Sequence, residues 1–80
     1  MTSTEVPLRS TEEVARTIGN NIKAALAEQG RNLEWLAGEI GIDVQSILKA
    51  FATEVPLWLT LDASFFLEIA PDRLIGAGDD

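Results

Sequence analysis

Few side chains in this sequence could carry out chemistry by themselves. The chain contains no Cys and no His, so it lacks thiolates, the commonest metal ligand and the usual general base at neutral pH. Its carboxylates are scattered, and no glycine-rich phosphate-binding loop is present. The sequence therefore predicts no enzyme, no catalytic residue, no metal site and no cofactor. What remains is recognition through hydrogen bonds, charge and apolar surface.

The polar residues best suited to recognition are Gln45 and Lys49. The Gln45 amide can both donate and accept a hydrogen bond, and Lys49 follows four residues later, which is one turn in a helix. Whether they share a face depends on the segment that carries them. That segment, from Asn32 to Thr53, is the one around which we expect the chain to be organised.

Two short runs of apolar residues at helical spacing enclose a glycine-containing turn. The first run contains Leu33, Leu36, Ala37 and Ile40, and the second contains Ile47, Leu48 and Phe51. Asn32 is suited to cap the first helix, Gly41 to end it, and Asp43 to cap the second. The three residues from Gly41 to Asp43 fit the sharp turn of a helix-turn-helix. Alternatively, this segment is an ordinary corner between two helices, as found in any small helical domain.

A longer helix is predicted before this pair. Ser10 and Glu13 have the spacing of a capping box, so the helix should begin at about Thr11. An apolar stripe marks its core face: Val14, Ala15, Ile18, Ile22, Ala25 and Leu26. Gly19 interrupts the stripe and predicts a kink or a restart. Gly30 is expected to end the helix.

After the pair, Pro56 prevents a continuous helix. We expect the next helix to be capped by Thr60 and to cover about residues 61–69. The side chains expected to face inward are Phe65 and either Leu61 or Phe66. A last helical turn should open at Pro71, with Leu74 and Ile75 closing the core.

The fold class predicted from these elements is all-α: a compact domain of four to five helices that contains a helix-turn-helix. The 80 residues allow one modest core. The expected divisions are a flexible arm at residues 1–9, the domain at residues 10–76 and an acidic tail at residues 77–80. The sequence lacks a long apolar run and a basic-then-apolar N-terminus, so we expect a cytoplasmic protein without a membrane segment.

The order of these segments resembles the lambda-repressor-like, Cro-type helix-turn-helix family of phage and bacterial regulators. The resemblance covers about residues 14–76. It is carried by Ile18, Ile22, Gly30, Leu36, Ala37, Gly41, Ile42, Ile47 and Leu74. Most of these are core or turn positions, so the resemblance implies the fold first and DNA binding through it.

In that family the second helix of the motif lies in the major groove of double-stranded DNA. When the family's base-contacting positions are transferred to this sequence, the resemblance implies that bases are contacted by Val44, Gln45, Ser46 and Lys49. The residues expected at phosphates are Arg16, Lys23, Arg31 and Asn32. Four or five cations in one copy neutralise too few phosphates for useful affinity, so two copies would have to bind paired half-sites. We therefore expect a homodimer on a short palindromic operator.

A protein-interaction module on the same fold is the second hypothesis. The net charge is −7, with six Lys and Arg against thirteen Asp and Glu, and Glu54 lies where the family usually has a basic loop. An acidic surface of this kind repels phosphates. The candidate dimer or partner interface consists of Trp58, Leu57, Phe66 and Trp35. Alternatively, the two Trp side chains complete the core.

Overall fold

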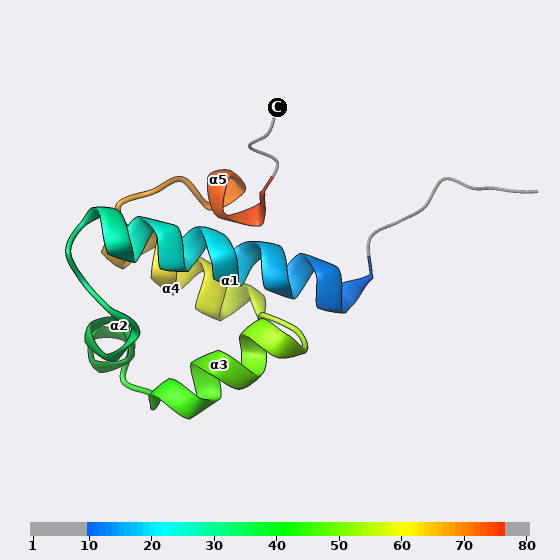
Figure 1. The fold of residues 1–80 in the computed structure, drawn as a ribbon, viewed down its shortest axis with the longest axis horizontal. Helices are drawn as coiled ribbons and strands as arrows, with labels where there is room; N and C mark the ends of the chain where they lie inside the picture. The colour runs from blue at the N-terminus through cyan, green and yellow to red at the C-terminus, as the bar shows by residue number, and fades with distance from the viewer. Residues whose placement is uncertain (1–9, 77–80) are drawn as a thin grey trace, which may run out of the picture.

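The computed structural model describes residues 10–76, which form five α-helices (Figure 1). They are α1 (Thr11–Glu28), α2 (Leu33–Ile40), α3 (Val44–Ala52), α4 (Leu57–Leu67) and α5 (Pro71–Ile75). The prediction of an all-α domain of four to five helices is confirmed, because no strand occurs in this part of the chain. The expected arm and tail, at residues 1–9 and 77–80, lie outside the described residues.

Helix α1 begins and ends where the sequence predicts. The Ser10 hydroxyl accepts a hydrogen bond from the Glu13 N–H at 3.0 Å, and the Glu13 carboxylate accepts one from the Ser10 N–H at 3.3 Å. This reciprocal pair satisfies two backbone donors that the first turn leaves free. At the other end, Gly30 takes a φ of 71° and turns the chain towards α2.

Gly19 does not interrupt α1, so the predicted kink or restart is wrong. The residue is buried where α1 meets α3, and a Cβ atom there would lie 2.7 Å from Cγ of Phe51. Carbon atoms normally approach no closer than about 3.5 Å. Gly19 therefore serves close packing of two helices, at a cost in helix propensity that the buried Phe51 ring offsets.

The turn between α2 and α3 is built from the predicted residues. The Asn32 carboxamide oxygen accepts from the Trp35 N–H at 2.9 Å and caps α2. Gly41 takes a φ of 93°, and the N–H groups of Gly41 and Ile42 both donate to the Ala37 carbonyl. Ile42 packs against the core, as expected for a residue that follows a glycine C-cap.

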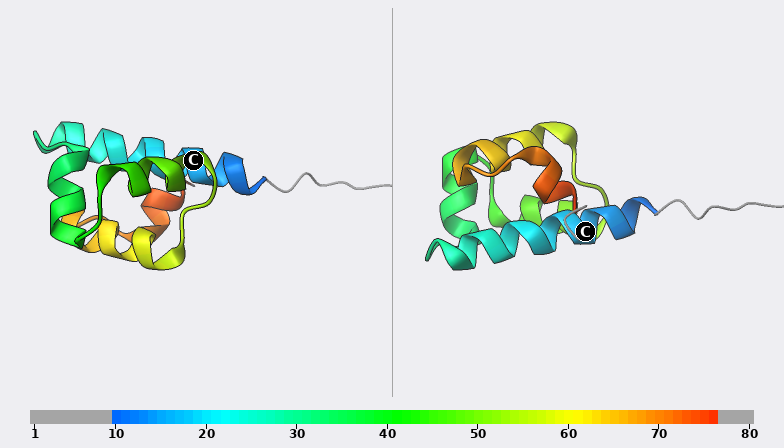
Figure 2. Two further views of the ribbon diagram at one scale, coloured as in Figure 1. Left: turned by 90° about the horizontal axis from the view of Figure 1, so that it is seen from below. Right: turned by 90° about the horizontal axis from the view of Figure 1, so that it is seen from above.

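One core joins the five helices. Its buried members are Ile18, Ile22, Ala25, Leu26, Leu36, Ala37, Ile47, Phe51, Ala63, Leu67 and Leu74. The predicted stripe of α1 supplies the largest share. Figure 2 shows α5 lying between α1 and α4, so the last helix closes the core from that side.

Helix α4 starts earlier than the sequence predicts. Its N-cap is Pro56, whose carbonyl accepts from the N–H groups of Leu59 and Thr60, both at 3.1 Å. Thr60 is not a cap, because it is buried inside the helix and its hydroxyl also donates to the Pro56 carbonyl. Leu59, Ala63 and Leu67 face the core and set the rotation of the helix. Phe65 therefore faces outward and not into the core, whereas Phe66 packs partly against it.

Helix α5 contributes one core side chain, not two. Leu74 is buried, as predicted, but Ile75 is exposed. Successive residues of a helix point about 100° apart, so a single short turn directs only one of two neighbours inward. The Asn21 side chain ties this turn to α1 by donating to the carbonyls of Leu74 at 2.9 Å and Arg73 at 3.3 Å.

Candidate nucleic-acid interface

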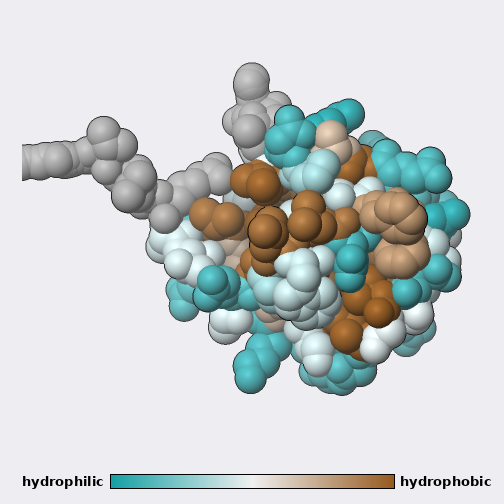
Figure 3. Space-filling model, turned by 180° about the vertical axis from the view of Figure 1, so that it is seen from behind, coloured by the Kyte–Doolittle hydropathy of each residue, from teal (hydrophilic) through white to brown (hydrophobic). Residues whose placement is uncertain are grey.

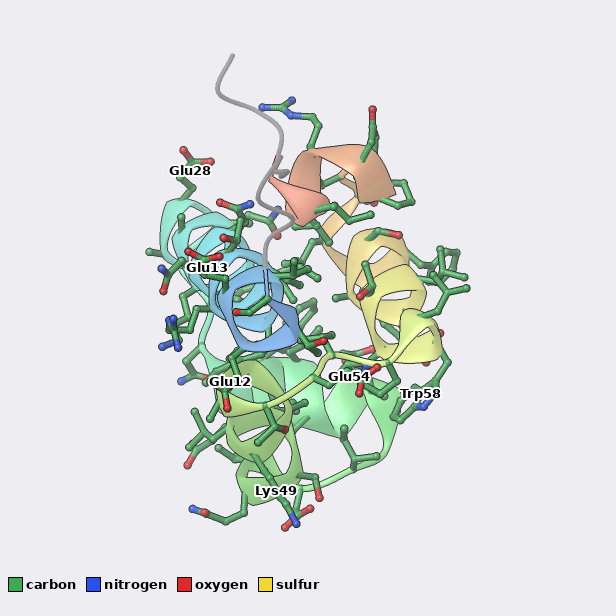
Figure 4. All side chains as sticks on the ribbon, turned by 90° about the vertical axis from the view of Figure 1, so that its right-hand side faces the viewer. Glu12, Glu13, Glu28, Lys49, Glu54 and Trp58 are labelled. Atoms are coloured by element: carbon green, nitrogen blue, oxygen red, sulfur yellow. The ribbon has the colours of Figure 1, made fainter. Side chains whose placement is uncertain are left out.

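The outer face of α3 carries the side chains that sequence reasoning selected. Ile47 and Phe51 are buried, which fixes the rotation of the helix and leaves Gln45 and Lys49 exposed on the opposite side. The two residues share this face because they lie one turn apart. Figure 4 shows Lys49 projecting from α3 away from the rest of the molecule. Val44 differs, because it is half-buried and packs against the core.

Ser46 is exposed, but its hydroxyl already has a partner. It donates to the Asp43 carboxylate over 2.5 Å, and this hydrogen bond lowers the pKa of Asp43. Asp43 is the N-cap residue of α3 by position, yet its side chain makes no capping hydrogen bond. The expected side-chain cap is therefore replaced by a bond between two side chains. A negative charge remains at the start of α3, where phosphates or bases would approach.

Two cations of α1 lie beside α3. Arg16 and Lys23 line a groove of about 300 Å³ together with Gly19, Asn20, Leu48, Phe51 and Ala52; we call it the α1–α3 groove. The Lys23 Nζ lies 5.9 Å from the centre of the Phe51 ring, within the range of a cation–π contact. Residues seven apart in α1 thus share one face, as their spacing predicts, and that face adjoins the exposed side of α3.

Arg31 and Asn32 mark the start of α2. The Arg31 guanidinium stacks on the Trp35 ring, with 4.0 Å between Cζ and the ring centre. Arg31 is exposed and held in place by this stacking. The Asn32 oxygen caps α2, and its amide nitrogen is the group that could donate to a phosphate. Trp35 itself is half-buried, with part of its ring against the core.

A second exposed surface lies on α4. Leu57, Trp58, Leu61 and Phe65 are 68%, 50%, 44% and 73% exposed, and we call these four the α4 stripe. Figure 3, which views the molecule from behind Figure 1, shows apolar side chains gathered over this helix. Leu57 and Trp58 were selected from the sequence for an interface. Leu61 and Phe65 were missed, because the apolar sequence of α4 does not indicate which of its faces is buried.

We call the exposed side of α3, which carries Gln45 and Lys49, the α3 face. Acidic and basic side chains are partly separated from each other around it. Figure 4, which looks along α1, shows Glu28 and Lys49 on opposite sides of the molecule, whereas Glu54 follows α3 in the loop to α4. No carboxylate lines the α1–α3 groove. The local field there is therefore less negative than the total charge suggests, because nearby charges dominate at short range.

Comparison with protein-family models, curated proteins and solved structures gave no match. No cluster of three or more carboxylates among residues 10–76 could hold a metal ion. None of the helices in this part of the chain combines the length and hydropathy that crossing a bilayer requires. The case for a function consequently depends on the α3 face and the α4 stripe.

Proposed function

We propose that this chain is a small DNA-binding regulator of the Cro type, acting in the cytoplasm, with α2 and α3 as its helix-turn-helix. In this proposal α3 lies in the major groove of double-stranded DNA. The observation that carries the proposal is the shared exposed face of Gln45 and Lys49, next to the cation-lined α1–α3 groove. Gln45 would read an adenine edge through two hydrogen bonds, and Lys49 a guanine or a phosphate.

Around this pair the other candidates take different roles. Arg16 and Lys23, which line the α1–α3 groove, would contact phosphates of one DNA strand. Arg31, stacked on Trp35 at the start of α2, would contact a further phosphate. Ser46 would not contact a base directly, because its hydroxyl donates a hydrogen bond to Asp43. Asp43 opposes binding because its negative charge repels phosphates. The affinity for DNA would therefore depend on the four cations Arg16, Lys23, Arg31 and Lys49.

The test is fluorescence-anisotropy binding to DNA from beside the chain's own gene and to scrambled DNA, at two salt concentrations. Gln45→Ala and Lys49→Ala should each weaken binding to the specific site roughly 10- to 100-fold, as expected for loss of one base contact. Arg73→Ala is the matched control, because it removes an exposed cation from α5. Absence of binding by the unaltered chain at low salt, where phosphate attraction is strongest, would overturn the proposal.

A protein-interaction module is the second candidate, and the α4 stripe favours it. Four large apolar side chains on one face form an exposed patch of the kind that often serves as a protein interaction site. The Asp43 charge at the start of α3 also favours this reading. In that case Gln45→Ala and Lys49→Ala leave partner binding intact, whereas substitutions in the α4 stripe abolish it.

A further inference from the structure

The α1–α3 groove has a cationic half and an apolar half. Arg16 and Lys23 line it from α1, and Leu48 and Ala52 line it from α3. Phe51, which is buried where the two helices meet, forms its base. In the proposed function, DNA phosphates contact the two cations, and the apolar half has no part in that contact. A ligand that uses both halves would have to combine an anion with an apolar body.

Three hydrogen-bond donors of α1 lie on the groove side of the helix. Arg16, Asn20 and Lys23 follow one another at intervals of four and three residues, so they share one face. Asn20 is exposed and lies between the two cations. At about 1.5 Å per residue, the cations are separated by about 10 Å along the helix, and their long side chains can converge on one anion above Asn20. A carboxylate there would accept from a guanidinium, an amide and an ammonium group.

The charge of the groove sets the sign of the ligand. None of the carboxylates in residues 10–76 lines it. By contrast, the hollow of about 160 Å³ between α1 and α5 is lined by Glu28 as well as Arg73, so the two charges there offset each other. Charges at short range outweigh the net charge of −7, which is screened at longer distances. The α1–α3 groove is therefore suited to an anion.

The apolar half of the groove sets the size and shape of the rest of the ligand. Leu48 is 39% exposed, and it is the one large apolar side chain of α1, α2 or α3 that is exposed. The Lys23 Nζ lies 5.9 Å from the centre of the Phe51 ring, so the Lys23 side chain lies over the base of the groove. A volume of about 300 Å³ is at the lower end of the range for small-molecule sites. One or two flat rings suit this space.

We propose that the α1–α3 groove binds a small amphiphilic carboxylate of the aromatic-acid class. The carboxylate of the ligand accepts hydrogen bonds from Arg16, Asn20 and Lys23, which fix its orientation. The apolar body packs on Leu48 and Ala52, which removes apolar surface of both partners from water. An inorganic anion would use the cationic half alone and bind more weakly.

A bound carboxylate would also regulate the α3 face, a consequence that rests on the proposed function. Arg16 and Lys23 cannot contact DNA phosphates while they hold the ligand. A saturating ligand should therefore lower the affinity for DNA. At about 0.9 per phosphate, it should also reduce the slope of log K against log salt concentration by about 2 for each copy bound.

An NMR titration of the full chain with β-naphthoate tests the site without DNA. The amide signals of Gly19, Leu48 and Ala52 should shift, with a dissociation constant below about 1 mM. The matched control ligand is β-naphthylmethanol, which has the same rings and no charge. It should bind at least about 10-fold more weakly, because it cannot form charge-assisted hydrogen bonds. Unshifted groove signals, or equal binding of the neutral compound, would overturn the proposal.

Substitutions separate the groove from the α4 stripe, the other apolar surface open to the probe. Lys23→Ala should weaken naphthoate binding about 10-fold, and Leu48→Ala about fivefold. The control variants are Arg73→Ala, which removes an exposed cation from α5, and Phe65→Ala, which removes an exposed ring from α4. Both should bind naphthoate as the unaltered chain does, and the amide spectrum of each variant shows that it folds. Loss of binding in Phe65→Ala, with none in Leu48→Ala, would place the probe on the α4 stripe and overturn the proposal.

DNA-binding anisotropy with and without saturating naphthoate, at matched ionic strength, separates this site from the proposed function. Naphthoate that shifts the groove signals and lowers DNA affinity supports both. Naphthoate binding by a chain that binds no DNA overturns the proposed function alone. A chain that binds DNA and shows no naphthoate binding overturns the ligand site alone. Naphthoate that fills the groove and leaves DNA affinity unchanged overturns the regulation.

Discussion

Gly19 is the single residue on which the contact between α1 and α3 depends most directly. Gly19→Ala should gain about 1 kcal/mol in helix propensity, yet its Cβ would lie 2.7 Å from the Phe51 ring. Because overpacking of a buried contact costs about 1–3 kcal/mol, we expect net destabilisation of about 1 kcal/mol. Urea unfolding measures it. Phe51→Leu combined with Gly19→Ala should recover part of the loss, and additive effects of the two changes would contradict the contact.

Asp43 and Ser46 form the other informative pair of residues. The Ser46 hydroxyl donates to the ionised carboxylate, which lowers the pKa of Asp43. A lowered pKa in the folded state means that the bond stabilises the fold above the unfolded pKa and is lost as the pH falls through the folded one. Ser46→Ala should therefore raise the Asp43 pKa. Carboxyl NMR titration measures the change, and an unchanged midpoint would show that the hydroxyl does not hold the charge.

Among the helices, those with paired local signals were predictable from sequence. The capping box at Ser10 fixed the start of α1, and Asn32 with Gly41 fixed both ends of α2. Helix α4 has no such pair, and the burial of Thr60, which rules it out as a cap, is a tertiary property. Apolar residues lie all round α4, so its sequence does not indicate that Phe65 faces outward as part of the α4 stripe. The shared exposed face of Gln45 and Lys49 was predictable from the helical spacing of the apolar residues of α3 alone.

The C-terminal end of α4 contains strain that can be removed. Glu68 takes a φ of 59°, a left-handed conformation that suits glycine, and its negative charge lies at the negative end of the helix dipole. Glu68→Gly should stabilise the domain by about 0.5–1 kcal/mol. Thermal and urea unfolding measure the gain. Ala70→Gly, two residues beyond and at ordinary negative φ, serves as the control and should give no gain.

For the molecule as a whole, the net charge of −7 and the proposed DNA contact make opposing demands. The total charge lowers affinity at every salt concentration, because it repels the whole duplex. The dependence of affinity on salt reports something different, namely how many phosphates the protein neutralises. The two effects can therefore be separated by measurement, and the acidic composition does not by itself decide against DNA.

The slope of log K against log salt concentration then counts the cations that touch DNA. Four candidates per copy, Arg16, Lys23, Arg31 and Lys49, give a slope of about −4 for a monomer and about −7 for a dimer, at about 0.9 per phosphate. Lys23→Ala should reduce the slope of a dimer by about 2, since it removes one contact from each copy. Glu28→Gln, which Figure 4 shows on the opposite side of the molecule from Lys49, should leave the slope unchanged, because that charge touches no phosphate and is screened by salt. A slope that Lys23→Ala does not alter would remove the α1–α3 groove from the DNA interface, whereas a reduction of about 1 would indicate that a single copy binds.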